Sequence, residues 1–247
     1  TKVFTATAMM QLAEQGLVDI DAPVTDYIPE FSVRSRFADA GPIRVRHLMT
    51  HHSGLPGDKV KAMFGDPPDH YRDFVPYLAT QHVSTPPEFV FAYSNLAVGL
   101  AGVVIERASG LSYEEYVTRN ILDPLEMRGT SVSLDERTAS AYAKAYSAGT
   151  EQTELDLGNA PAGGIYSSVA DMTRFVRFAI EGGEVDGTRV LEAQTLAQMM
   201  SAQNEAVTRD LGRPMGLGWA IARAGLDHVE QVAWHNGSTM YHQSTMV

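Results

Sequence analysis

The longest apolar run of the chain, LAVGLAGVVI at residues 96–105, is the feature that most restricts the fold. A helix that crosses a membrane needs about 18 or more apolar residues, so this run is too short to span a bilayer. Asn95 precedes the run, and Gly110 follows it at a position where helices commonly end. We therefore predict a buried core helix over residues 95–108 and no membrane span in this segment.

Composition excludes several classes of function. The 247 residues carry a formal net charge of −11, whereas binding to the phosphates of nucleic acids needs concentrated Lys and Arg. There is no Cys, which excludes thiol chemistry, disulfides and zinc sites built on Cys. The length suits one large domain or two small ones. Because no linker separates two parts, we predict a single domain over residues 1–247.

Hydrophobic spacing and capping signals predict further helices around the core helix. Residues 1–15 have apolar side chains at three- and four-residue intervals, which favours a helix. Ser112 with Glu115, and Ser168 with Asp171, have the spacing of capping boxes at the starts of two more helices. The remaining helical predictions are a single turn within residues 43–57 and helices over residues 69–80 and 192–201.

Short aromatic and β-branched segments near the end of the sequence predict antiparallel strands. They are GLGWAIA (216–222), HVEQVAWH (228–235) and STMYHQSTMV (238–247). We expect an α+β fold with a helical part at about residues 1–205 and a sheet part at about residues 215–247. Because the sequence starts inside a helix and stops inside a strand, we expect a fragment truncated at both ends, with an incomplete sheet.

Several motifs of enzymes and binding proteins are absent from the sequence. No Ser has Gly both two residues before and two residues after it, and neither the phosphate-binding loop nor the dinucleotide-binding glycine pattern occurs. His47 and His51 have i, i+4 spacing, which leaves a metal site open as a weak alternative. No Glu of a zincin motif lies between them and no third ligand is evident, so a structural role is favoured and no metal is expected.

Lys2 is the first of three segments that together indicate one chemistry. A desolvated Lys with a lowered pKa can activate a Ser three residues earlier, since the S-x-x-K spacing puts both side chains on one helix face. That Ser would lie two positions before Thr1, outside the sequence. Taken alone, Lys2 is more simply a solvated or structural lysine.

The second segment, AYSNLAVGL, places Tyr93 and Asn95 directly before the core helix. A Tyr hydroxyl can pass a proton to a leaving group, and an Asn amide can hold a substrate carbonyl. The pattern Y-x-N is weak by itself. Its simpler reading is an Asn helix cap beside a half-buried Tyr.

The third segment, WHNGS, carries His235, Asn236 and Gly237 at the end of a predicted strand. Gly237 would let a ligand approach the backbone, and the amide of Ser238 could donate to a developing oxyanion. Alone, the Asn-Gly pair is more typical of a hairpin turn.

The order and spacing of these segments resemble the serine β-lactamase and penicillin-binding-protein superfamily. The most similar branch contains class C β-lactamases, D-alanyl-D-alanine carboxypeptidases, D-aminopeptidases and related esterases. The resemblance covers nearly the whole chain and includes a segment similar to the family's HLLTHTSGLP. The segments that carry it are TKVFTATAMMQLAEQGLVDIDAPVTDYIPEF, IRVRHLMTHHSGLP, PPEFVFAYSN, PLEMRGTSV, PAGGIYSSVADMTRF and MGLGW.

The resemblance implies a β-lactamase/transpeptidase-like catalytic domain that hydrolyses its substrate through an acyl-enzyme. In that case Lys2 and Tyr93 assist the missing Ser, and Asn95 orients the substrate amide. The triplet of residues 235–237 aligns the substrate, and the Ser238 amide belongs to the oxyanion hole. The implied substrate is a small-molecule ester, a D-residue peptide or an amide, with no cofactor. A fragment of residues 1–247 is itself expected to be inactive because it lacks the nucleophile.

Departures from the family pattern refine this expectation. The triplet has His235 where β-lactamases commonly have Lys, and Asn236 where Thr is usual. A mostly neutral His attracts a carboxylate less than Lys does, which favours an esterase or a D-peptidase over a β-lactamase. Glu88 replaces the Gly of a usual PPG, and Met240–Tyr241 replace a common Pro-Gly pair, with no effect that the sequence reveals.

One alternative function stays open beside the hydrolase. A catalytically silent family member could bind a peptide or a protein partner without turnover. The sequence leaves the compartment undetermined, and family resemblance slightly favours an exported or periplasmic protein.

Overall fold

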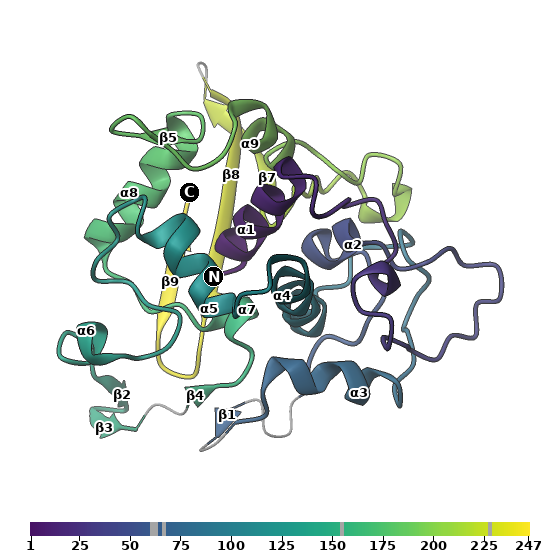
Figure 1. The fold of residues 1–247 in the computed structure, drawn as a ribbon, viewed down its shortest axis with the longest axis horizontal. Coiled ribbons are helices and arrows are strands. Elements are labelled where there is room, and N and C mark those ends of the chain that lie inside the picture. Colours follow the sequence, from purple (N-terminus) through teal and green to yellow (C-terminus); the bar gives the residue numbers. More distant parts are fainter. Residues whose placement is uncertain (60–63, 66–67, 154–155, 227–228) are drawn as a thin grey trace.

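Helix α4 (Asn95–Ser109) forms the centre of the helical part, as the apolar run predicts. Helices α1, α2, α3, α5 and α7 all contact it (Figure 1). The Ser94 hydroxyl accepts a hydrogen bond from the Ala97 amide at 3.0 Å and so caps the helix. Gly110 ends the helix in the left-handed conformation with φ of 72°. Prediction of this element is confirmed, although the cap is Ser94 and not Asn95.

The computed structural model describes residues 1–59, 64–65, 68–153, 156–226 and 229–247. The α-helices are α1 (Lys2–Glu14), α2 (Val45–Thr50), α3 (Phe74–Leu78), α4, α5 (Tyr113–Val117), α6 (Glu136–Ala139), α7 (Ala160–Gly163), α8 (Val169–Ile180) and α9 (Ala193–Met199). Shorter helical turns are η1 (Val24–Asp26), η2 (Tyr71–Asp73), the π-helical η3 (Thr118–Leu122) and η4 (Thr208–Asp210). The strands are β1 (Phe64–Gly65), β2 (Ala145–Ser147), β3 (Thr150–Gln152), β4 (Asp156–Leu157), β5 (Glu184–Val185), β6 (Thr188–Arg189), β7 (Ala220–Leu226), β8 (Val229–Ser238) and β9 (Gln243–Met246).

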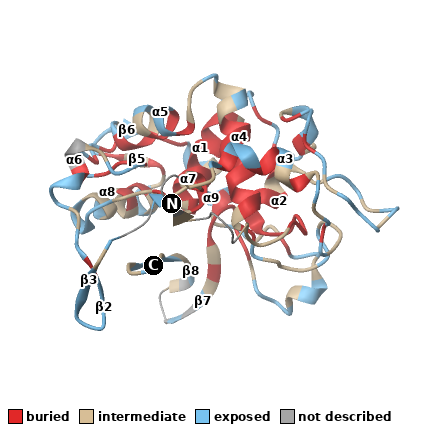
Figure 2. Ribbon diagram, turned by 90° about the horizontal axis from the view of Figure 1, so that it is seen from below, coloured by how far each residue is buried: buried red, intermediate tan, exposed pale blue. Residues whose placement is uncertain are grey.

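Helix α1 is buried on all sides over residues 2–12 (Figure 2). It contacts α4, α5, α7 and α9, and Gly218 of the segment before β7 also lies against it. Its buried polar side chains find partners: the Thr5 hydroxyl donates to the Pro161 carbonyl at 2.6 Å, and the Gln11 amide donates to the Asn120 carbonyl at 2.9 Å. The predicted N-terminal helix is confirmed, and it lies inside the core.

Helix α7 lies close against α4 because α4 has glycine at the contact. A Cβ atom at Gly102 would overlap the ring of Pro161, and a Cβ at Gly99 would lie 2.7 Å from the Phe74 ring. Side chains at these positions would therefore force neighbouring elements outward. This glycine contact sets the distance of α7 from the core helix.

The capping predictions are confirmed with one difference. Ser112 and Glu115 form a reciprocal capping box at the start of α5. Ser168 caps α8 by accepting from the Asp171 amide at 3.1 Å. The Asp171 carboxylate instead accepts from the Gly129 amide at 2.8 Å, so the second box is only half formed. The α8 carboxylate thereby fixes a neighbouring turn.

The other helical predictions differ from the structure mainly at their boundaries. Residues 69–80 contain η2 and α3, which together cover residues 71–78 with Pro76 inside α3. The turn predicted within residues 43–57 is α2, and it ends at His51, whose φ is 62°. The helix predicted at residues 192–201 is α9, which is shorter at both ends.

Strands β7, β8 and β9 form one antiparallel sheet in that order. The predicted strands are confirmed in number and order, although β7 begins at Ala220 and His228 lies outside the described residues. Asn236 and Gly237 lie within β8, opposite Thr245 and Ser244 of β9. The hairpin interpretation of Asn-Gly is therefore wrong, and the chain reverses instead at residues 239–242.

The part of the chain predicted to be helical also contains three two-stranded sheets. They pair β1 with β4, β2 with β3, and β5 with β6, each antiparallel. Within the described ranges, none of these strands exceeds three residues, which is too short for a sequence period to reveal. The predicted helical part, at about residues 1–205, is therefore not entirely helical.

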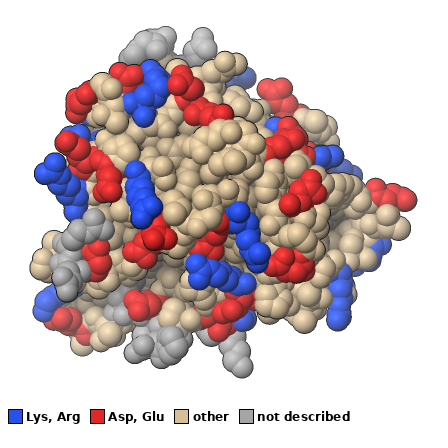
Figure 3. Space-filling view, viewed as in Figure 1, with Lys and Arg blue, Asp and Glu red and all other residues tan. Residues whose placement is uncertain are grey.

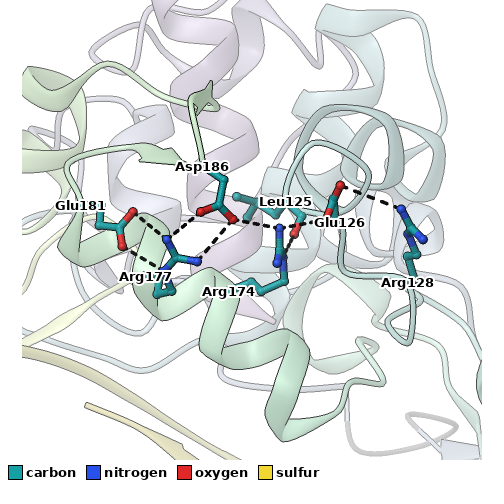
Figure 4. Close-up of polar contacts among 7 residues, drawn as sticks. All are labelled: Leu125, Glu126, Arg128, Arg174, Arg177, Glu181 and Asp186. Carbon is teal, nitrogen blue, oxygen red and sulfur yellow. Dashed lines mark hydrogen bonds and ion pairs between the residues drawn. The ribbon is translucent and has the colours of Figure 1, made fainter.

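Charges of both signs are interspersed on the face shown in Figure 3. Helix α8 provides one ordered group, in which Arg177 pairs with Glu181 and Asp186, each at 2.9 Å, and Arg174 pairs with Glu126 at 3.1 Å (Figure 4). Exposed pairs of this kind contribute little each, about 0–1 kcal/mol. They link α8 to the turn at Glu126 before it and to the turn at Asp186 after it.

Length and apolar composition allow no single described helix to cross a bilayer. The pair formed by α4 and residues Tyr113–Leu122 meets the same criteria together, but with a bend of 77° between its two parts.

Candidate functional site

Lys2 is a buried amine, with 7% of its surface exposed. It occupies the first turn of α1, and its Nζ donates to the Ala162 carbonyl of α7 at 2.7 Å. Burial lowers the pKa of Lys2 to about 8, although the negative charge of Asp58 opposes that shift. The interpretation of Lys2 as a solvated terminal residue is therefore wrong. At pH 7 an amine with this pKa is neutral, and able to accept a proton, in about one molecule in ten.

Tyr93 lies against the Lys2 amine. The Lys2 Nζ is 5.0 Å from the centroid of the Tyr93 ring, and the His51 ring is 4.2 Å from it on a tilted plane. Burial, with a smaller contribution from Asp58, raises the pKa of Tyr93 to about 12. Its hydroxyl is thus protonated at neutral pH and available as a donor. Tyr93 is 45% exposed, so the ring also borders solvent.

The backbone around Tyr93 is fixed by the α2–loop segment. The Ala92 amide donates to the His51 carbonyl at 2.9 Å, and the Ser94 amide donates to His51 Nδ1 at 3.2 Å. The Ser94 hydroxyl donates to the Pro56 carbonyl at 2.7 Å. Burial first, and then the charge of Lys2, lower the pKa of His51 well below its ordinary value, so this ring is a neutral acceptor. His51 therefore supports the Tyr93 backbone, which agrees with the structural role that the sequence favours for this residue.

Asn95 is the first residue of α4, and its side chain contacts Asp58. Its Nδ2 donates to Asp58 Oδ1 at 2.9 Å, while its backbone amide donates to the Gly57 carbonyl at 2.8 Å. The Asn159 amide donates to the Asn95 carbonyl at 2.8 Å. Sequence reasoning missed Asp58, because no local motif links it to a residue 37 positions away.

A buried His–Asp pair stands behind the Tyr93 segment. His52 Nε2 lies 2.7 Å from Asp210 Oδ2, and both side chains are 2% exposed. Asp210 Oδ1 accepts from the Phe91 amide at 2.6 Å, and the Asn204 amide also donates to this carboxylate. Burial alone would raise the pKa of Asp210, but these hydrogen bonds hold it below the ordinary value. Neither residue was singled out from the sequence.

Strand β8 brings the third predicted segment to the same region. Burial and then the charge of Lys2 lower the pKa of His235 to about 4, so its ring is neutral at neutral pH. His235 Nδ1 lies 2.6 Å from the Asn236 carbonyl. Asn236, Gly237 and Ser238 follow along the exposed end of β8, and Ser238 pairs with Gln243 of β9. Among the described residues no contact joins Ser238 directly to Lys2 or Tyr93.

The hydroxyl groups nearest to Lys2 along the chain are already engaged. Thr5, three residues after Lys2, is fully buried and bonded to the Pro161 carbonyl and to the Tyr113 hydroxyl at 2.7 Å. The Thr1 hydroxyl accepts from the Ile165 amide at 3.1 Å. These groups serve packing and capping.

His47 and His51 have separate hydrogen-bond partners. His47 Nδ1 accepts from the Arg44 amide at 3.1 Å, and its Nε2 lies 3.2 Å from Glu88. His51 Nδ1 is bonded to the Ser94 amide as described. Within the described ranges, no three His, Asp or Glu side chains gather as a candidate metal site.

Comparisons with known proteins agree with this architecture. The family model described as Beta-lactamase matches residues 1–247. Penicillin-binding protein 4 of Amycolatopsis lactamdurans is 29% identical over 228 residues, which are 88% of this chain and 58% of that protein. The chain therefore spans little more than half the length of this relative.

Two solved structures extend the likeness to the fold. The octameric penicillin-binding protein homologue from Pyrococcus abyssi has a TM-score of 0.80 and 26% identity, covering 99% of this chain and 56% of that one. A D-stereospecific amidohydrolase from Streptomyces has a TM-score of 0.75 and 25% identity, covering 96% and 73%. The predicted α+β, β-lactamase/transpeptidase-like fold is confirmed.

Proposed function

The chain belongs to the β-lactamase family of serine hydrolases, and from this premise we propose an esterase or D-peptidase that works through an acyl-enzyme. Residues 1–247 are proposed to form one catalytic domain of that enzyme. The observation that carries the proposal is the buried Lys2 amine, whose pKa lies near 8 and which contacts Tyr93. Burial of this amine costs stability, and a buried group with a shifted pKa is typical of a site that transfers protons.

The proposed nucleophile is a serine two positions before Thr1 in the longer protein. At S-x-x-K spacing, its hydroxyl would lie on the same helix face as the Lys2 amine. In the acylation step the serine oxygen bonds to the substrate carbonyl carbon while its proton passes to neutral Lys2. Collapse of the intermediate breaks the bond to the leaving group, which takes a proton from the Tyr93 hydroxyl while Lys2 passes the serine proton on to the Tyr93 oxygen. Water then releases the acyl group and restores the serine.

The remaining predicted residues are proposed to bind the substrate. Asn95 would orient the amide of the acyl part, and residues 235–237 would align the substrate along β8. The Ser238 amide, with that of the nucleophile, would donate to the oxyanion. These roles are supported by the position of Lys2: its Nζ lies 5.0 Å from the centroid of the Tyr93 ring, and its charge helps to lower the pKa of His235.

Neutral His235 supports an esterase or D-peptidase over a β-lactamase. A Lys at this position would offer a fixed positive charge to a substrate carboxylate, whereas a His with a pKa of about 4 offers none at neutral pH. The likeness to a D-stereospecific amidohydrolase is consistent with this preference.

A covalent probe tests the proposal. The longer protein is treated with a fluorophosphonate and, separately, with penicillin, and the labelled peptide is identified by mass spectrometry. We expect stoichiometric fluorophosphonate labelling of the serine two positions before Thr1, and no labelling of a preparation limited to residues 1–247. A residue other than Ser at that position, or an unlabelled longer protein that hydrolyses no p-nitrophenyl ester, would favour the catalytically silent binder.

A further inference from the structure

Asp58 determines which atoms of Asn95 are left to meet a substrate. A carboxylate only accepts hydrogen bonds, so the Asn95 atom 2.9 Å from Asp58 Oδ1 must be the amide nitrogen. The Asn95 Oδ1 therefore points elsewhere, and no hydrogen bond reaches it from the described residues. An unoccupied carbonyl oxygen seeks an N–H donor. The Asn95 Oδ1 is therefore available to accept from a substrate N–H, whereas the sequence predicts an Asn95 amide that holds a substrate carbonyl.

The backbone holds this arrangement in place from both sides. Gly57, directly before Asp58, accepts from the backbone amide of Asn95, so the two segments are tied at adjacent residues. On the other side, the side chain of Asn159, directly before α7, donates to the Asn95 carbonyl. Neither side chain needs to reorganise for Asn95 Oδ1 to remain an acceptor.

In the reactive form of the site, in which Lys2 is neutral, the charge around Asn95 also favours a cationic group. Asp58 raises the pKa of both Lys2 and Tyr93, which shows that its negative charge acts across the site. His51 and His235 are neutral because burial lowers the pKa of each. Arg209 and Arg213 approach the same segment, but their guanidinium groups lie over the rings of Phe89 and Phe91, at 4.0 and 5.7 Å.

We propose that the site selects acyl groups bearing a free amino group and discriminates against acyl groups bearing a free carboxylate, with Asp58 as the specificity-determining residue. This inference rests on the proposed function, since it concerns the substrate of that same site. The ammonium group would donate to Asn95 Oδ1 and lie near the Asp58 charge. A carboxylate in the same place would face an acceptor oxygen and a like charge.

Three p-nitroanilides of similar size test the inference at pH 7 on the longer protein. D-alanyl p-nitroanilide is cationic, propionyl p-nitroanilide is neutral, and succinyl p-nitroanilide is anionic. We expect kcat/KM to fall in that order. D58N keeps an acceptor oxygen for Asn95 but removes the charge, so the ratio of cationic to anionic kcat/KM should fall by about tenfold, as expected for one charge in a partly screened site. Lys2 ionisation affects all three substrates alike and cancels in the ratio.

D69N is the matched control, because Asp69 is a carboxylate on the neighbouring loop that pairs with Lys59 and does not contact Asn95. It should leave the ratio unchanged, and D58E, which retains the charge, should keep most of it. Hydrolysis of the neutral substrate with no preference between the charged ones, or an equal effect of D58N and D69N, would overturn this inference alone. Absence of turnover with every anilide and with p-nitrophenyl esters would overturn the proposed function, and the inference with it.

Discussion

The two sides of the site differ in how the fold supports them. Lys2 and Asn95 stand on α1 and α4, whose neighbours cover them almost completely. His235 to Ser238 lie on β8, where residues 236–238 are exposed and β9 is exposed over most of its length (Figure 2). The helical side is held by burial of apolar side chains, and the strand side mainly by ladder hydrogen bonds. Substitutions should therefore have unequal effects on the two sides.

The largest effect is expected from K2M on the helical side. Removing the amine removes the proposed proton acceptor, and we expect kcat/KM to fall by at least about 10³-fold. Esterase assays of the longer protein measure this. An activity within tenfold of wild type would contradict the proposed role of Lys2.

The same K2M variant should gain stability. The folded pKa of Lys2 is about 8 against 10.5 for an unperturbed Lys, so at pH 7 the protein bears the full cost of burying the charge, about 3 kcal/mol. Loss of the hydrogen bond to Ala162 reduces the gain to about 2 kcal/mol. Between pH 8 and 10.5 the unfolded chain binds more protons than the folded one, so wild-type stability rises with pH. The advantage of K2M should vanish above pH 10.5 in denaturant titrations.

The second prediction compares how much side-chain packing contributes to stability on the helical side and on the strand side. L100A truncates a fully buried side chain of α4 and should lower the free energy of unfolding by about 3 kcal/mol. T245A alters an exposed position of β9 and should change it by less than about 0.5 kcal/mol. Chemical denaturation of both variants gives the comparison, and equal losses would show that the sheet is as tightly coupled as the core.

A third, smaller effect is expected behind Tyr93. D210N replaces one acceptor oxygen with an NH₂ group that faces donors from Asn204 and His52, which should cost about 2 kcal/mol. Because Asp210 also holds the Phe91 amide, we expect kcat to fall up to about tenfold through misplacement of Tyr93. E106Q is the control, since Glu106 is similarly bonded to Tyr71 and Arg72. It should lose stability but keep its activity per folded molecule.

The smallest effect concerns the strand side. A Cβ at Gly237 would lie 2.7 Å from the Ser244 hydroxyl of β9, so G237A should cost about 1 kcal/mol as the two strands adjust. Adding S244G should recover most of this loss in thermal unfolding. Without recovery in the double variant, the clash across β8 and β9 would not be the cause.

Local signals predicted the parts of the fold that local interactions determine. The apolar run, the Ser112 cap and the order of the final strands follow from neighbours in sequence. The Asn-Gly pair misled because a type I′ turn needs positive φ at both central residues, whereas Asn236 and Gly237 have none. Their pairing with β9 overrides the turn preference.

The site was predictable only where a motif carried it. Lys2, Tyr93, Asn95 and the β8 triplet came from a familiar order of residues, and their roles stay predictions. Asp58 and Asp210 could not be found in this way, because they meet Asn95 and Phe91 across 37 and 119 positions through loops with no period. The burial that lowers the pKa of Lys2 is likewise a property of packing and not of its neighbours in sequence.

The contact between Gly102 and Pro161 limits which residues can evolve at position 102. An alanine at position 102 would push α7 away from α4. The Ala162 carbonyl, which accepts from the Lys2 amine, would move with α7. Selection should therefore guard this glycine as strictly as the lysine, although no substrate reaches it. A mutational screen confined to the reacting residues would overlook Gly102, although the packing at Gly102 helps to position the Lys2 amine.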